Sequence, residues 1–276
     1  MGVVNVTPDS FSDGGKWFGA DSAIAHGLEL VEAGADIVDV GGESTRPGAQ
    51  RVSAEEELRR VRPVITELVR AGVVVSVDTM RAEVAEWAVE AGVSLVNDVS
   101  GGLADPQMPR LVGTAGVPYV VMHWRGHSHD MYSRAMFKDV VREVRDELAQ
   151  RVEAATAVGV DPAKIVLDLG LGFSKLPDDK GPGAHNWQLL ARMADVARIG
   201  GRDFPVLVGA SRKRFLGKLL AGPTGAPRPF EDSDGATVAV TALAAAAGAW
   251  CVRVHQVPAN ADAVRVAAAW RGAAQA

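Results

Sequence analysis

Short apolar runs recur along the whole chain, and each run stops at a polar or charged residue. Segments with helical periodicity lie between consecutive runs, and each is long enough for one crossover helix. The polar residues at the ends of the eight runs are Asn5, Asp39, Asp78, Asn97, His123, Asp168, Ser211 and His255. A further polar stretch, residues 43–46, follows the second run. Eight strands alternating with helices predict a (β/α)8 TIM barrel, a fold that collects its chemistry at the carboxyl ends of its strands.

The segments between the runs predict helices. In chain order these are expected near residues 21–33, 54–71, 81–91, 106–115, 138–158, 185–199, 212–221, 234–248 and 259–271. Ser53 before three helix-favouring residues is a typical start signal, and Ala-Gly pairs such as 115–116 are typical helix ends. Polar, glycine-containing stretches at 7–20, 43–52 and 123–137 follow strands and predict loops over the barrel mouth. Stretches 175–184 and 222–233, rich in proline, glycine and acidic residues, predict surface loops.

Composition agrees with one large α/β domain. The 276 residues contain no linker that would divide the chain, so a single domain over 1–276 is expected. The lone Cys251 excludes a disulfide framework and fits a reducing compartment. The start of the sequence does not read as a signal peptide, and no apolar run approaches the roughly 20 residues of a membrane span. A cytoplasmic protein is therefore expected.

Charge narrows the choice of partner. The net charge of −5 argues against nucleic acid. Five cations nevertheless stand beside predicted strand ends: Arg46, Arg212, Lys213, Arg214 and Arg253. Gathered at one barrel mouth, they predict an anionic small-molecule ligand. Any one of them could instead be a solvated surface residue, and Arg214 is the first candidate for that reading.

Eight motifs stand in register with the eight predicted strands. They are Asn-Val-Thr-Pro-Asp-Ser-Phe-Ser-Asp-Gly-Gly at 5–15, Gly-Gly-Glu-Ser-Thr-Arg-Pro-Gly at 41–48, Val-Asp-Thr at 77–79, Asn-Asp-Val-Ser-Gly-Gly at 97–102, Met-His at 122–123, Asp-Leu-Gly-Leu-Gly-Phe at 168–173, Ser-Arg-Lys at 211–213 and Arg-Val-His at 253–255. Their order and spacing across the whole chain resemble those of the dihydropteroate synthase family, and in particular those of its actinobacterial members. One such motif would be a weak signal, whereas eight in register are a strong one.

The resemblance implies an enzyme of folate biosynthesis with a pterin-binding TIM barrel, the target of sulfonamides. Such an enzyme condenses 6-hydroxymethyl-7,8-dihydropterin diphosphate with p-aminobenzoate, and it gives 7,8-dihydropteroate and pyrophosphate. The resemblance also implies Mg²⁺ as cofactor and a homodimer formed through helices on the outer face of the barrel.

The pterin ring presents amino and N–H donors beside a carbonyl, so buried carboxylates and an amide suit its edge. Asp78, Asn97 and Asp168 have these types and end three predicted strands. The resemblance implies the following pterin-binding set: Asp78, Asn97, Met122, Asp168, Phe173 and Lys213. A structural alternative stays open for several of them, because Asp78 could cap the next helix and either Met122 or Phe173 could be ordinary core.

TIM barrels often bind phosphate after strands 7 and 8, where this chain has Ser211-Arg212-Lys213 and Arg253-Val254-His255. The diphosphate-binding set implied by the resemblance is Asn5, Thr45, Arg46, Arg253 and His255. Asn5 is also the implied ligand of Mg²⁺. A single protein oxygen holds Mg²⁺ weakly, so the metal is expected to arrive with the diphosphate.

The two polar loops after the first and second strands are implied to close over p-aminobenzoate and exclude water from the reacting methylene. The p-aminobenzoate set is Phe11, Ser12, Thr45, Pro47 and Arg214. The implied catalytic groups are Lys213, Asp78, Asp168 and Asp13. The chain departs from the family pattern at Leu169, where proline is usual, and in a longer segment 176–184.

Three other readings have to be weighed. His123, His127 and His129 lie close together, but no Cys or Glu partner joins them, and this argues against a zinc site. A pterin-binding module of a methyl-transfer system would share the Asp and Asn pattern but would have no use for the anion-binding motifs. A catalytically silent paralogue would be expected to lose loop or anion-site residues, all of which are present.

Overall fold

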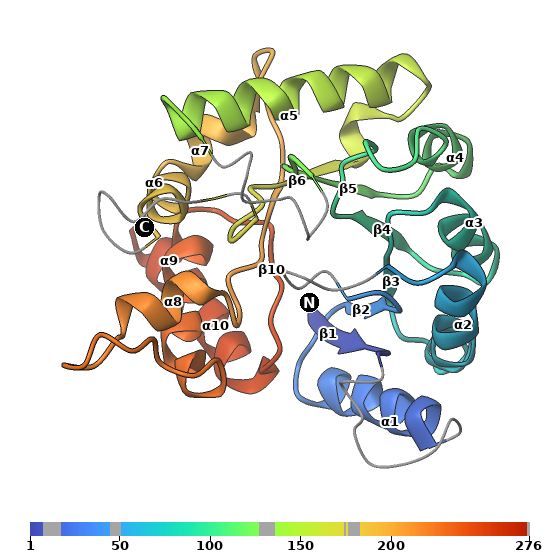
Figure 1. Ribbon diagram of the computed structural model, residues 1–276, viewed down its shortest axis with the longest axis horizontal. Coiled ribbons are helices and arrows are strands. Elements are labelled where there is room, and N and C mark those ends of the chain that lie inside the picture. The colour runs from blue at the N-terminus through green and yellow to red at the C-terminus, as the bar shows by residue number, and fades with distance from the viewer. Residues whose placement is uncertain (8–17, 45–50, 127–135, 174, 176–182, 275–276) are drawn as a thin grey trace. The chain divides into compact units, whose positions relative to one another are not determined.

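A computed structural model of the chain describes residues 1–7, 18–44, 51–126, 136–173, 175 and 183–274. Eight short strands form one sheet whose order follows the chain (Figure 1). They are β1 (Gly2–Asn5), β2 (Val38–Gly41), β3 (Val75–Asp78), β4 (Leu95–Asp98), β5 (Tyr119–Met122), β6 (Ile165–Asp168), β9 (Val206–Val208) and β10 (Cys251–Val252). Neighbouring strands pair in parallel, for example β1 with β2 and β6 with β9. The predicted strand order and alternation of a (β/α)8 chain are therefore confirmed.

Helices connect the strands, close to the predicted positions. They are α1 (Phe18–Glu32), α2 (Ala54–Arg70), α3 (Ala82–Glu90), α4 (Met108–Ala115), α5 (Val140–Ala157), α6 (Ala184–Ala191), α7 (Met193–Ala197), α8 (Arg214–Leu219), α9 (Asp234–Ala246) and α10 (Val257–Ala273). Ser53 caps α2 as predicted, since its side chain accepts a hydrogen bond from Glu56 N. Gly116 ends α4 in the left-handed conformation, with φ 65°.

The single helix predicted near 185–199 is wrong. Arg192 leaves the helical conformation and separates α6 from α7. A small antiparallel hairpin of β7 (Arg198–Ile199) and β8 (Arg202–Asp203) follows. Its two turn residues are both glycines with positive φ, a pairing that favours a tight hairpin and that the sequence displayed.

The position of Asp39 also differs from the prediction. β2 begins at Val38, so Asp39 lies inside the strand and does not end it. The parallel register places Asp39 opposite Val3 on one side and Ser76 on the other. Asp39 is fully buried there, one layer below the carboxyl end of the strand.

In the first four strands, apolar residues on the face opposite to the polar strand-end side chains form the core. Val4, Val40, Val77 and Val96 are fully buried, and each is next in sequence to a residue at the carboxyl end of its strand. Alternation along a strand sends these valines to one face and their neighbours to the other. The packing of the core thereby decides which face receives the polar side chains.

The chain divides into two compact units, one of residues 1–121 with 151–165 and one of residues 122–150 with 166–276. The single domain expected over 1–276 stays a prediction. None of the helices in the described part of the chain is both long and apolar enough to cross a membrane.

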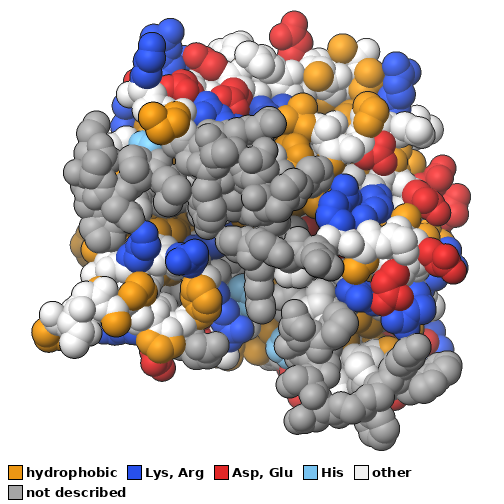
Figure 2. All heavy atoms as spheres, in the orientation of Figure 1, with side chains coloured by type: hydrophobic (Ala, Val, Ile, Leu, Met, Phe, Trp, Pro, Cys, Tyr) orange, Lys and Arg blue, Asp and Glu red, His pale blue; other side chains and the backbone are white. Residues whose placement is uncertain are grey.

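Surface charge is mixed. Figure 2 shows Lys and Arg side chains interspersed with Asp and Glu on the face in view. Several of these charges pair locally along a helix, such as Arg59 with Glu56 and Arg265 with Asp262, and exposed pairs of this kind contribute little to stability. The informative charges are therefore the few at the strand ends.

Candidate functional site

Four polar or small residues form one row in the first unit, across β1 to β4. Asn5 pairs with Gly41, Gly41 with Asp78, and Asp78 with Asn97. Directly paired residues on parallel strands project from the same face of the sheet. A side chain at Gly41 would approach Asp78, because a Cβ built there lies 3.3 Å from Asp78 Cβ. The glycine therefore leaves room beside the carboxylate.

Asn97 is oriented from below by Asp39. The Asn97 Nδ2 donates to Asp39 Oδ2 at 3.0 Å, and both residues are buried. With its amide nitrogen directed at Asp39, the carbonyl oxygen of Asn97 is the part of the amide left to accept from a ligand. The apolar pattern predicts Asp39 only as a strand end, whereas it stands two residues before the last position of β2.

The capping alternative for Asp78 is not what the structure shows. The first residue of α3, Ala82, donates its N–H to Asp105 Oδ2 at 2.9 Å. Thr79 donates to the buried Glu57 at 2.6 Å and accepts from Arg81 N at 3.2 Å. The start of α3 is thus served by other residues, and Asp78 is half-buried at the end of β3.

Buried ion pairs fix the base of the stretch that follows β2. Arg81 binds Glu43 at 2.8 Å and also pairs with Glu57. Glu43 in turn accepts from Val52 N at 3.1 Å. Burial raises the pKa of Glu57, while the hydrogen bond from Thr79 and the charge of Arg81 act to lower it. This cluster ties both ends of the 43–52 segment to α2 and α3, and sequence reasoning missed it.

Asp168 is the predicted ligand-binding carboxylate of the second unit, and it is buried. Its Oδ1 accepts from Gly170 N at 2.7 Å, and its Oδ2 lies beside Gly209, whose added Cβ would be 3.8 Å away. Burial raises the pKa of Asp168, whereas the Gly170 N–H and the charges of Lys213 and Arg253 pull it down. A buried carboxylate facing two cations is suited to accept hydrogen bonds from a ligand.

The loop from Asp168 to Phe173 is held tightly. Gly170 has φ 65°, and a Cβ there would collide with the carbonyl oxygen of His123. His123 N donates to the carbonyl oxygen of Asp168 at 2.9 Å, and Gly172 N donates to Asn186 Oδ1 at 2.8 Å. The loop ends at buried Phe173, and Lys213 Nζ lies 4.2 Å from the centre of its ring. Asp168, Phe173 and Lys213 are therefore brought together.

The anion-binding motifs after β9 and β10 also meet. Arg253 N continues the ladder by donating to Val208 O at 2.9 Å. Ser211 Oγ accepts from His255 N at 3.2 Å and lies 2.9 Å from His255 Nδ1. A Ser211 hydroxyl that donates to Nδ1 places the ring proton of neutral His255 on Nε2. Arg212 has φ 58°, which is uncommon outside glycine and marks a strained turn.

Several predicted site residues cannot be placed. Phe11, Ser12, Asp13, Thr45, Arg46 and Pro47 lie outside the described residues. Arg214 is exposed at the start of α8, and Met122 is buried at the end of β5. His127 and His129 are also outside the described part, so the zinc reading rests on His123 alone, and both of its ring nitrogens meet other side chains.

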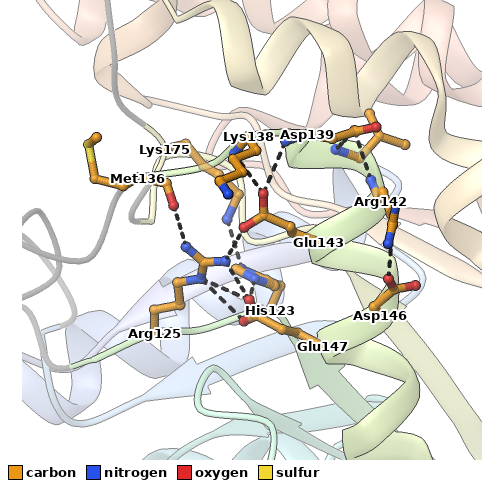
Figure 3. Close-up of polar contacts among 11 residues, drawn as sticks. His123, Arg125, Met136, Lys138, Asp139, Arg142, Glu143, Asp146, Glu147 and Lys175 are labelled. Carbon is orange, nitrogen blue, oxygen red and sulfur yellow. Dashed lines mark hydrogen bonds and ion pairs between the residues drawn. The ribbon is translucent and has the colours of Figure 1, made fainter.

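His123 belongs to a buried polar cluster that the sequence did not predict (Figure 3). Its Nε2 lies 3.1 Å from Glu147 Oε2 and its Nδ1 lies 2.9 Å from Lys175 Nζ. The prediction of a surface loop from residue 175 onward is wrong at its first residue, because Lys175 is only 4% exposed. The Gly-Phe-Ser-Lys sequence gave no sign of this, since a lysine before a polar stretch is usually solvated.

Comparison with known proteins shows which family has a similar sequence and fold. A family model described as "Pterin binding enzyme" matches residues 1–255. The dihydropteroate synthase of Mycobacterium leprae is 52% identical over 271 residues, which cover 98% of this chain and 92% of that protein. A structure of Xanthomonas albilineans dihydropteroate synthase with 4-aminobenzoic acid has a TM-score of 0.86 and 44% identity, covering 98% of this chain and 92% of that one. Another, in complex with 7,8-dihydropteroate, has a TM-score of 0.83 and 41% identity with the same coverage.

Proposed function

This chain belongs to the pterin-binding enzyme family and is a dihydropteroate synthase. From that premise we propose a role in the reaction for each of the residues at the strand ends. The predicted family and the predicted pterin-binding TIM barrel are thus confirmed. The chain is an enzyme, and the reaction is the condensation of 6-hydroxymethyl-7,8-dihydropterin diphosphate with p-aminobenzoate. The observation that carries the division of roles is the buried Asp168 carboxylate, with Phe173 beneath Lys213 at the end of the same loop.

The pterin-binding role falls to the acceptors. Asp168 and Asp78 accept from the ring N–H and amino groups, and the Asn97 amide, already oriented by Asp39, accepts through its oxygen. Met122 and Phe173 contact the ring, and Lys213 donates to the pterin carbonyl. Each interaction replaces a hydrogen bond to water, so a mismatch at a buried acceptor costs more than a match gains.

The diphosphate is bound by Arg253, His255 and Lys213, and Ser211 holds the His255 ring in place. Thr45 and Arg46 are proposed to join them. Asn5 is half-buried at the end of β1, and its row neighbour Gly41 has no side chain. Among the described residues no group of three or more His, Cys, Asp or Glu could hold a metal of its own. This donor set fits Mg²⁺ that is bound through Asn5 together with the diphosphate oxygens. When bound, Mg²⁺ would neutralise charge on the leaving pyrophosphate.

Carbon–oxygen cleavage runs ahead of attack by the amine. Lys213, Arg253 and His255 stabilise negative charge on the departing pyrophosphate. Asp168 and Asp78 stabilise the positive charge that develops on the methylene and ring, which are preorganised electrostatic effects. The amine of p-aminobenzoate is nucleophilic when neutral, so it needs no strong base, and Asp13 is proposed to assist in the loop. The p-aminobenzoate itself is proposed to contact Phe11, Ser12, Thr45, Pro47 and Arg214.

Pyrophosphate release is the direct test of the reaction. It should depend on added p-aminobenzoate when the pterin diphosphate and Mg²⁺ are supplied. A pterin-binding methyl-transfer module would bind the pterin but release no pyrophosphate. Release without p-aminobenzoate would indicate simple hydrolysis and would contradict the proposed condensation.

An isotope effect tests the dissociative path. Deuterium on the exocyclic methylene should give a sizeable normal secondary effect, provided that chemistry limits the measured step. An effect near unity under that condition would favour concerted displacement, and both aspartates would then be binding groups only.

A homodimer and a cytoplasmic location stay predictions. The dimer is supported by large apolar side chains exposed on α9 and α10, which pack side by side in Figure 1. Leu243 is 70% and Trp270 75% exposed. Sedimentation of the wild-type protein should give twice the mass of the chain, and Leu243→Glu should reduce it to one.

A further inference from the structure

Lys175 is buried immediately beyond the loop that carries Asp168 and Phe173. Its Nζ donates to the carbonyl oxygen of Phe173 at 2.9 Å and lies at the same distance from His123 Nδ1. The ring of Phe137 lies 5.6 Å from the ammonium. The long side chain thus turns back toward the loop and does not extend into solvent (Figure 3).

These contacts fix the protonation pattern of His123. A lysine ammonium has donors only, so Nδ1 of His123 has to accept from it. The ring proton therefore sits on Nε2, where it is donated to Glu147 Oε2 at 3.1 Å. Glu147 on α5 also accepts a hydrogen bond from Arg125. Burial raises the pKa of Glu147, but the hydrogen bonds from His123 and Arg125 outweigh this effect and lower the pKa to about 2. An ionised carboxylate thus orients the imidazole, and the imidazole orients the lysine.

The same histidine holds the other end of the loop. Its backbone N–H donates to Asp168 O at 2.9 Å, and its carbonyl oxygen lies against Gly170. His123 consequently fixes the loop at Asp168 through its main chain and at Phe173 through Lys175. Two of the proposed pterin contacts are therefore held by one cluster, none of whose members is among the proposed pterin-binding residues.

The arrangement is costly if its purpose is packing alone. A buried ammonium loses its hydration, and here its Nζ contacts the Phe173 carbonyl oxygen and the His123 ring, whose other nitrogen lies beside Glu147. A methionine could fill the same space without a charge. The charge also acts on the loop, because Lys175 is one of the cations that, after Lys213 and Arg253, counter the effect of burial on the pKa of Asp168.

We propose that Lys175, oriented by His123 and Glu147, is a positioning residue for pterin recognition, which sets Phe173 and the Asp168 carboxylate against the ring. This inference rests on the proposed pterin-binding function of the loop. It assigns Lys175 no contact with substrate and no role in binding pyrophosphate. The two ligands can therefore be used to separate a positioning role from a general structural one.

The test is calorimetry on the full chain with 6-hydroxymethylpterin and, separately, pyrophosphate with Mg²⁺. Lys175→Met keeps the volume and removes the charge. We expect about tenfold weaker pterin binding or more, from the loss of a buried charged hydrogen bond behind the loop, and pyrophosphate affinity within about twofold of wild type. Lys138→Met is the matched control, because Lys138 is an exposed lysine beside the same cluster, and it should bind both ligands normally.

His123 variants keep the test decisive if Lys175→Met does not fold. His123→Leu removes the acceptor for Lys175 and should weaken pterin binding, whereas His123→Asn offers an amide oxygen near the Nδ1 position and should recover part of the loss. Wild-type pterin affinity in folded Lys175→Met or His123→Leu overturns the positioning role, as does equal loss of pterin and pyrophosphate binding. If wild-type protein binds no pterin and releases no pyrophosphate, the proposed function itself has failed, which is a distinct result.

Discussion

Asp98 and Asp168 each end a strand of the same sheet with a buried carboxylate, yet their hydrogen bonds differ. Asp98 accepts from Ser100 N at 2.8 Å, Ser100 Oγ at 2.7 Å, Gly102 N at 2.7 Å and Tyr119 Oη at 2.8 Å. Asp168 accepts only from Gly170 N, at 2.7 Å, as far as the described residues go. Burial raises the pKa of both carboxyl groups.

The difference separates a structural aspartate from one suited to a ligand. Four internal donors saturate Asp98, so it has no acceptor to offer. Asp168 keeps acceptor capacity while cations lie near it, and buried polar atoms are rarely left in that condition without a reason. Asn97 and Asp98 show the same contrast within one strand. Alternation directs Asn97 to the same face as Asp78 and directs Asp98 to the other face, where it bonds Tyr119.

The largest effect on the folded state should follow from Asp98→Ala. The substitution leaves the buried donors of Ser100, Gly102 and Tyr119 unpaired, which should lower the free energy of unfolding by about 3–5 kcal/mol. Urea denaturation measures this. Asp262→Ala is the control, because Asp262 is exposed and should matter by less than about 0.5 kcal/mol. Equal effects of the two changes would mean that the four bonds of Asp98 contribute nothing net.

Lys213→Ala should act on activity and leave stability nearly intact. Lys213 is half-buried at the start of α8, and its ammonium faces Phe173 and Asp168. Removing its charge from the reacting groups should lower kcat/KM by about 10²- to 10³-fold, or roughly 3–4 kcal/mol. Pyrophosphate release and a melting curve decide, with exposed Arg142→Ala as the control. Near-normal turnover would remove Lys213 from the catalytic set.

Asp168→Asn should weaken pterin binding without a loss of stability. The amide replaces an acceptor by a donor facing the ring N–H groups, a cost of about 1–3 kcal/mol in affinity. Calorimetry with 6-hydroxymethylpterin measures it, and urea denaturation supplies the contrast with Asp98. Unchanged affinity, or a loss of stability as large as that of Asp98→Ala, would make Asp168 a structural residue too.

The sequence was sufficient for the strands and for most of the residues at their carboxyl ends because both follow from local pattern. Apolar runs of four residues mark buried parallel strands, and the residues after them fall at the carboxyl edge whatever the rest of the chain does. Asp78 and Asp168 were therefore predicted correctly as strand ends, while Asp39 was displaced because an apolar run does not fix the register against its neighbours.

The supporting contacts could not be predicted, because they join residues far apart in sequence. Lys175 reaches His123 across 52 positions and Thr79 reaches Glu57 across 22. Nothing in the local sequence distinguishes a buried lysine from a solvated one, since burial depends on what packs over it. The residues proposed to bind the ligand were thus easier to find than those that support them.

The smallest effect concerns pH, and it compares wild type with Asp168→Asn. Burial raises the folded-state pKa of Asp168 above its ordinary value of 3.8, so the folded protein holds this proton more tightly than the unfolded chain does. The resulting stability is fully present below 3.8 and is lost as pH rises through the folded-state pKa. The asparagine variant cannot titrate, so its free energy of unfolding should improve relative to wild type as pH rises from about 3.5 to about 7. Other carboxylates, such as Glu147, titrate alike in both proteins and cancel in the difference. Saturating 6-hydroxymethylpterin should flatten the trend, because ring donors stabilise the ionised carboxylate. A difference independent of pH without ligand would mean that Asp168 is as well solvated as a surface aspartate, and its contrast with Asp98 would then lie only in hydrogen bonding.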